Sequence, residues 1–264
     1  APATADTTLP EEVQTQEQTE ENKEVDPQEG ENPVEATGIE VLDADGQEIF
    51  NTDGKRFENL QDAINAVPDY EESAENKPII KISQSIVLTD TITIKVRIQS
   101  TANGVTIKRN TEGEAFTGTM FSVTGENSRL QFFIDDATDA TLTVSGELPA
   151  NGVIEAEATG AIIDVQSGGT FGLNSGVTLT GNNYAEGGSA INCTGGKIVL
   201  AGGTVTNNDS GDKGAVYSDT DISMEGDASV SGNVDNKNIY LGENAKLTLT
   251  KVTSVLTGQS TFTH

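Results

Sequence analysis

Cysteine, histidine and tryptophan are almost missing from this chain of 264 residues. It holds one cysteine, Cys193, one histidine, His264, and no tryptophan. A single cysteine excludes an internal disulfide and a cysteine-rich zinc site, and we expect Cys193 to point inward as a small apolar side chain. A single histidine at the last position excludes metal sites that need two imidazoles, and it leaves no well-placed histidine for a catalytic triad.

Positive charge is also scarce. Lysine and arginine number 15 against 42 acidic residues, and the formal net charge is −27. Nucleic-acid binding draws most of its affinity from basic side chains that neutralise phosphates, so we predict no nucleic-acid partner. The same charge disfavours docking on anionic membranes, and no run approaches the ~18 apolar residues of a membrane-spanning helix, so we predict no membrane insertion.

The first 38 residues carry eleven acids, four prolines and no aromatic residue, with Lys23 as the single base. Such a segment cannot bury enough apolar surface to offset the entropy lost on ordering. We therefore predict a disordered acidic linker over residues 1–38 and one ordered domain over residues 39–264. The chain starts at Ala1 with an acidic, threonine-rich stretch, which fits a mature N-terminus left by signal peptidase or an arbitrary boundary.

Residues 39–78 are predicted to form a hairpin followed by a helix. The apolar residues 39–42 and 49–50 flank a turn-rich cluster, which is typical of a hairpin. The two aspartates of this turn lack the glycine of a calcium-binding loop, so we predict no metal site there. Apolar side chains recur every three or four residues from Phe57 to Val67, which predicts a helix that Pro68 ends.

The chain after Pro78 reads as short β-strands separated by glycine, asparagine, aspartate and serine. Apolar positions in these strands recur about every 25 residues, which indicates an internal structural repeat. Three columns share this period: Leu179, Val205, Val230 and Val255; Phe171, Ile198, Ile222 and Leu247; Ile163, Ile191, Ala215 and Ile239. One repeat cannot bury its apolar positions alone, whereas stacked repeats bury them as continuous columns. We therefore predict an all-β fold, a three-faced parallel β-helix or solenoid.

Polar residues also recur with this period. Asn182, Asn208 and Asn233 fall at one turn position of successive repeats. Asparagine tolerates the left-handed conformation of a tight corner, and stacked amides can form a hydrogen-bonded ladder, so we interpret all three as structural. Hydroxyl residues flank the first apolar column and should face outward, as ordinary strand surface or, alternatively, as a face for an ordered surface such as ice or a crystalline glycan. These residues are Thr178, Thr204, Ser229 and Ser254, and Thr180, Thr206 and Ser231.

The helix and the repeats together resemble pectate-lyase-like proteins with a right-handed parallel β-helix. FENLQDAINA (57–66) resembles the N-terminal capping helix of that family. GGSAIN (187–192), GGTVTNN (202–208) and GAVY (214–217) resemble the degenerate repeat of adhesin-like cell-wall surface proteins of Gram-positive gut bacteria. The resemblance covers about residues 55–258 and implies a secreted or cell-wall-associated parent protein with further domains after His264. It is weak for function, because this architecture hosts lyases, hydrolases, adhesins and scaffolds.

Polysaccharide cleavage is the enzymatic alternative. The resemblance implies that a lyase would pair carboxylates with an arginine or lysine base, but no arginine follows Arg129, and lysines in polar turns gain little of the desolvation that lowers a pKa. A hydrolase needs two carboxylates at a controlled separation, and Asp135-Asp136 is the one aspartate pair of the predicted domain. The tripeptide Ile107-Lys108-Arg109 resembles a basic segment of such hydrolases but lacks acidic partners, so a turn or a surface charge explains it. We predict no catalytic residue, no cofactor and no bound metal.

Aromatic side chains, on which carbohydrate sites commonly depend, are few. The tyrosines are Tyr70, Tyr184, Tyr217 and Tyr240. Tyr217 and Tyr240 lie about one repeat apart and should stack, whereas Tyr184, in the longer turn 182–188, is the best candidate for a surface contact. We therefore expect a non-enzymatic extracellular surface module, an adhesin-like scaffold or stalk that contacts a host protein or a glycan through its turns. A diverged polysaccharide lyase or glycoside hydrolase is the alternative.

Overall fold

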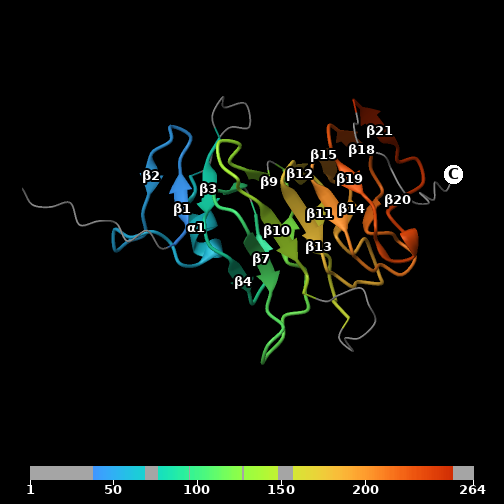
Figure 1. Cartoon of the computed structure of the whole chain (residues 1–264), viewed down its shortest axis with the longest axis horizontal. Helices are drawn as coiled ribbons and strands as arrows, with labels where there is room; N and C mark the ends of the chain where they lie inside the picture. The colour runs from blue at the N-terminus through green and yellow to red at the C-terminus, as the bar shows by residue number, and fades with distance from the viewer. Residues whose placement is uncertain (1–37, 69–76, 95, 127, 148–156, 252–264) are drawn as a thin grey trace, which may run out of the picture. The chain divides into compact units, whose positions relative to one another are not determined.

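The computed structural model describes residues 38–68, 77–94, 96–126, 128–147 and 157–251 (Figure 1). All of them belong to one compact unit that begins at Val34. The predicted linker lies outside the described residues except for Gly38, and so do Tyr70, Ser254 and Val255.

Most of the described chain forms three sheets of stacked strands. Within each sheet the strands lie side by side, and from Ile79 onward they follow chain order (Figure 1). The nine-stranded sheet contains β2 (Glu48–Ile49), β1 (Glu40–Leu42), β3 (Ile79–Ile82), β6 (Arg97–Ser100), β9 (Arg129–Ile134), β12 (Thr170–Asn174), β15 (Lys197–Ala201), β18 (Ile222–Glu225) and β21 (Leu247–Thr250). The β4–β19 sheet contains β4 (Ile86–Leu88), β7 (Val105–Arg109), β10 (Leu142–Ser145), β13 (Val177–Thr180), β16 (Thr204–Thr206) and β19 (Ser229–Val230). The β5–β20 sheet contains β5 (Ile92–Thr93), β8 (Phe121–Val123), β11 (Ile163–Gln166), β14 (Ile191–Thr194), β17 (Val216–Ser218) and β20 (Ile239–Leu241).

From β3 onward, each strand pairs in parallel with the strand three places along the chain, so consecutive strands belong to different sheets. Three consecutive strands, one from each sheet, together make one coil. The inward side chains of all coils form a single apolar core. The prediction of a mostly β fold with repeated strands stacked in parallel is confirmed. This arrangement is what a β-helix requires, because neighbouring coils then satisfy one another's backbone groups.

The strand register confirms two of the three predicted columns over their described members. Leu179 pairs with Val205 and Val205 with Val230, and all three are buried. The column from Phe171 to Leu247 is also in register.

The third predicted column is wrong at one position. Ile191 pairs with Val216, and Val216 with Ile239, so Val216 takes the place expected for Ala215. Ala215 is also fully buried, at the corner before β17. Because Ala215 and Val216 are both buried, the alternation of inward and outward side chains is not visible at the start of this strand. The prediction from the sequence therefore assigned the column position to Ala215, one residue before the correct one.

The segment before the first coil forms the predicted hairpin, with β1 antiparallel to β2 and also to β3. The helix is shorter than predicted, since α1 spans Leu60–Ala66. Asn59 is its N-cap, and its side chain accepts hydrogen bonds from the backbone of Gln61 and Asp62, which starts the helix at this point. Phe57 instead forms an isolated antiparallel bridge with Ile39. A 3-10 turn, η1, spans Val234–Asn236.

Candidate functional site

The three predicted corner asparagines are buried and joined from coil to coil. The backbone N–H of Asn182 donates to Oδ1 of Asn208 (3.2 Å), and that of Asn208 donates to Oδ1 of Asn233 (3.0 Å). The side-chain amide of Asn233 continues to Oδ1 of Asn238 at 2.9 Å. We call this chain the asparagine ladder. Its hydrogen bonds satisfy polar groups that lie out of reach of water.

The backbone at this corner corrects one part of the prediction. The ladder residue itself does not take the left-handed conformation; Asn233, for example, has φ −81°. The residue before it does, because the chain must turn before the amide can enter the core. These preceding residues are Gly181 (φ 69°), Asn207 (φ 55°) and Gly232 (φ 66°).

Arg109 joins the ladder at Asn182. Its side chain is 1% exposed, and Nη2 donates to Oδ1 of Asn182 at 3.0 Å. Nε donates to the carbonyl of Gly146 (3.1 Å), Nη1 donates to the carbonyls of Phe116 and Gly118, and the guanidinium lies 5.2 Å from the centre of the Phe116 ring. Burial lowers the pKa of Arg109 to about 10, so the group is still charged at neutral pH.

The interpretation of Arg109 as a turn or surface charge is therefore wrong. Val105, Ile107 and Arg109 are the buried, inward-facing positions of β7, while Thr106 and Lys108 face outward. Strand alternation alone would have placed Arg109 inward. The prediction instead placed Arg109 at the surface because of its charge, since an ionised side chain is rarely buried without an acidic partner.

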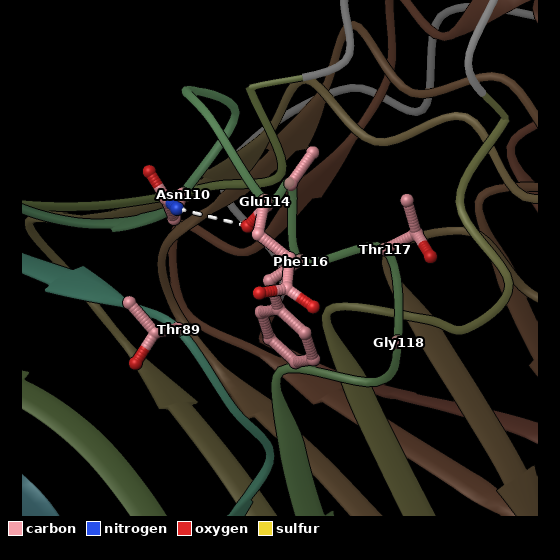
Figure 2. A pocket seen from close by; sticks show the side chains of 7 residues that line it. Thr89, Asn110, Glu114, Phe116, Thr117 and Gly118 are labelled. Atoms are coloured by element: carbon pink, nitrogen blue, oxygen red, sulfur yellow. Dashed lines mark hydrogen bonds between the residues drawn. The ribbon is translucent and has the colours of Figure 1, made fainter.

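Phe116 and Gly118, whose carbonyls accept hydrogen bonds from Arg109, also line a cavity of about 480 Å³ (Figure 2). Figure 2 shows that the loop after β7 forms one side of it and that Thr89, just after β4, lies across from Phe116. The amide of Asn110 donates to the carbonyl of Glu114 (3.2 Å) and shapes the loop. The residues that line the cavity are Thr89, Asn110, Glu114, Ala115, Phe116, Thr117 and Gly118. One carboxylate with hydroxyls and an amide can bind polar groups, but these described lining residues include no base to pair with it.

Tyr184 lies in the turn between β13 and β14 and is half-buried. Its backbone N–H donates to the carbonyl of Asp209 (3.0 Å), which fixes the turn against the next coil. A side chain at Gly187 would come within 2.8 Å of the Tyr184 ring and 2.7 Å of Oδ1 of Asn192, so these two groups flank the glycine closely. Burial raises the pKa of Tyr184, and the carboxylates of Asp164 and Glu186 raise it further.

Asn192 connects Tyr184 to a column of outward side chains on the β5–β20 sheet. In that column Asp164 pairs with Asn192, Asn192 with Tyr217, and Tyr217 with Tyr240. The two tyrosine rings lie 5.8 Å apart, as the predicted stacking requires. The structure thus brings Tyr184, the predicted contact residue, close to the polar side chains of Asn192 and Asp164 in this column. Sequence reasoning missed Asp164 and Asn192, since only the register places them in one column.

The described members of the predicted hydroxyl columns on the β4–β19 sheet are half-exposed, and the first column is longer than expected. Thr178 pairs with Thr143, and Thr143 with Thr106, two coils before the predicted start. The longer turns of the early coils break the 25-residue spacing, which is why the sequence did not reveal these two members.

The residues considered for catalysis remain dispersed. Asp135 and Asp136 follow β9, whereas the lysines after residue 130 lie on other strands and turns. Among the described residues, no group of three or more histidine, cysteine or acidic side chains is placed to hold a metal ion. Cys193 is buried as predicted, with Sγ 3.5 Å from the hydroxyl of Thr220.

Two further results bear on identity. Within the part of the chain that the structure describes, no helix has the length and apolar character needed to cross a lipid bilayer. Comparison of the chain with protein-family models, curated proteins and solved structures found no significant match. Function therefore has to be argued from the geometry alone.

Proposed function

We propose that this chain is a non-enzymatic module of the cell surface, an adhesin-like scaffold or stalk that meets a host protein or a glycan through its turns. The parent protein is secreted or attached to the cell wall. We further propose that the three sheets close into a right-handed β-helix whose first coil is capped by α1. Two hydrogen bonds between the Gln61 amide and the backbone of Thr93 in β5 support the capping role, because they occupy groups at the edge of the first coil.

The buried polar connection between coils carries the scaffold proposal. Arg109 and the asparagine ladder direct their hydrogen bonds to carbonyls and amides of neighbouring coils. Satisfied buried networks fix one arrangement of the groups they join. The buried guanidinium of Arg109, whose pKa is lowered to about 10, therefore holds coils together, and Arg109 is not among the residues that line the neighbouring cavity. A stiff, stacked core is the property that a stalk needs.

Incubation of the full chain with pectin, alginate and glycosaminoglycans, with and without calcium, tests this proposal. We expect no more unsaturated or reducing ends than heat-unfolded protein releases. Turnover that disappears in Glu114→Gln, which alters the cavity wall, but persists in Glu112→Gln, which changes the same loop outside the lining, would contradict the proposal. That result would favour the alternative, a diverged polysaccharide lyase or glycoside hydrolase.

A further inference from the structure

The outward column of the β5–β20 sheet is polar or aromatic at every described coil. Successive members are in register, so the column crosses six coils and spans about 24 Å at about 4.8 Å per coil. In order, its residues are Thr93, Ser122, Asp164, Asn192, Tyr217 and Tyr240. We call it the outer column. The large apolar side chains that are exposed, Phe50, Val87 and Leu249, all lie elsewhere.

The middle of the outer column is held by hydrogen bonds among its own side chains. The amide of Asn192 donates to Oδ1 of Asp164 (2.8 Å), and Gln166 donates to Oδ2 of the same carboxylate (2.8 Å). Oδ1 of Asn192 accepts the backbone N–H of Gly188 at 3.3 Å. These contacts keep the acceptors of Asp164 in place and bring the turn that carries Tyr184 against the column.

Tyr217 and Tyr240 form one end of the outer column, which we call the tyrosine end, and this end has hydrogen-bonding groups available for a ligand. Lys213 lies above both rings, with Nζ 5.0 Å from the centre of Tyr217 and 5.2 Å from that of Tyr240. Within the described residues, neither this ammonium nor the hydroxyls of Tyr184, Tyr217 and Tyr240 form a hydrogen bond. The tyrosine end therefore combines aromatic surface with free donors and acceptors.

We infer that the outer column, with Tyr184 and Lys213 beside it, binds a neutral oligosaccharide that runs from coil to coil. Sugar hydroxyls need both donors and acceptors, which phenols, amides, a carboxylate and an ammonium together provide. Aromatic rings offer the apolar contact that the C–H faces of a sugar need. This inference rests on the proposed function, since it names the partner that a surface scaffold would hold.

Other ligand classes fit this column less well. The core of a protein–protein interface is commonly apolar, and none of the exposed large apolar side chains described, Phe50, Val87 and Leu249, lies on this column. An anionic glycan or a nucleic acid would meet the carboxylates of Asp164 and Glu186 as well as the ammonium of Lys213, on a chain of net charge −27. A neutral glycan avoids this repulsion and still uses the polar groups.

Binding of the full chain to a printed array of neutral and uronate-containing oligosaccharides, followed by calorimetry with the tightest-binding sugar, tests the inference. We expect a neutral sugar to bind, and Tyr217→Ala and Tyr240→Ala each to weaken binding about two- to tenfold. Tyr217→Phe keeps the ring and should lose less, so it separates contact from folding. Thr178→Ala, on the hydroxyl face of the β4–β19 sheet, is the matched control and should bind as the unaltered chain does.

Three results would overturn the inference: no neutral sugar binds, a uronate sugar binds more tightly, or both tyrosine variants bind normally. A melting curve for each variant shows whether a loss of binding reflects unfolding. The proposed non-enzymatic function is tested separately, because only cleavage products of the sugar in the calorimeter cell would contradict it. A sugar that is bound and cleaved would retain the site and reject the scaffold, whereas no binding and no cleavage would reject the site alone.

Discussion

Arg109 places a positive charge in the core, and no acidic side chain among the described residues pairs with it. Its donors go to neutral acceptors, the carbonyls of Gly146, Phe116 and Gly118 and the amide oxygen of Asn182. Carbonyl dipoles compensate a buried charge only in part, which is why the pKa of Arg109 falls to about 10. Below pH 10 the buried charged form of Arg109 lowers the stability of the folded chain. This loss of stability is relieved only as the pH rises from the pKa of the folded state toward the pKa of the unfolded state.

Replacement of Arg109 by alanine should nevertheless destabilise the fold. The substitution opens a cavity and removes the donor from four acceptors that are buried or partly buried, so we expect a loss of about 2–4 kcal/mol in the free energy of unfolding. Lys108→Ala is the matched control, because Lys108 is 43% exposed and its ammonium lies 3.9 Å from Glu147. It should change stability by less than about 0.5 kcal/mol. Urea denaturation of both variants measures the difference, and equal losses would contradict the burial of Arg109.

Tyr184 offers a titration that reports on its own surroundings. Its raised pKa comes from burial first and from Asp164 and Glu186 second. The phenol therefore stabilises the folded chain below pH 10, and this contribution is lost as the pH rises through the folded pKa.

We expect Glu186→Gln to bring the pKa of Tyr184 partway back toward 10, because burial remains. Ultraviolet titration, with Tyr184→Phe to identify the signal, measures the change. Asp53→Asn, in a turn of the N-terminal segment, is the control and should leave the titration as it was. A pKa that does not respond to Glu186→Gln would show that this carboxylate is not near the phenol.

At the scale of the strands, alternation decides which side chains stabilise the fold. Val205 in β16 is fully buried, while Thr204 and Thr206 on either side are half-exposed. Val230 in β19 is buried between Ser229 and Ser231 in the same way, one coil later. The inward residues of one column contact one another across coils, so each supports its neighbours above and below.

Val205→Ala and Val230→Ala should each cost about 1–3 kcal/mol, because the stacked column cannot close around the lost methyl groups. Alanine at Thr204, Thr206, Ser229 or Ser231 should change stability by less than about 0.5 kcal/mol. Denaturant midpoints of the six variants measure this alternation. Similar losses at all six positions would mean that the register is wrong.

For the whole molecule, the dominant electrostatic term is self-repulsion. With a net charge of −27, like charges in the compact chain oppose folding. Among the described residues the ion pairs are few and partly exposed; the shortest of these joins Arg56 Nε to Glu48 Oε1 at 2.6 Å, with both side chains 24% exposed. Such pairs contribute too little to offset the repulsion.

Salt should therefore stabilise the fold. Raising sodium chloride from about 0.01 M to about 1 M shortens the screening length from about 30 Å to about 3 Å. We expect the melting temperature to rise by about 2–4 °C, which is the shift that about 1 kcal/mol produces in a domain of this size. Circular dichroism measures it. Potassium chloride should act alike, since screening depends on ionic strength, and a falling melting temperature would show that ion pairs dominate instead.

The repeat was readable from the sequence wherever coil length is nearly constant. Leu179, Val205 and Val230 recur at about 25 residues, and the structure stacks them as predicted. The early coils were not readable in this way. Phe121 pairs with Ile163, which lies 42 positions later, so a fixed period cannot align them.

The sequence by itself determined the strands and their inward faces, because apolar alternation is a local property that needs no knowledge of partners. Only the tertiary structure decided which residues meet. Asp164, Asn192, Tyr217 and Tyr240 come from four coils, and their column exists because parallel stacking brings equivalent positions within about 4.8 Å of one another. The burial of Arg109 was settled in the same way, since its charge is met by the carbonyl of Gly118 in the following loop and by the carbonyl of Gly146 and the amide oxygen of Asn182 from other coils.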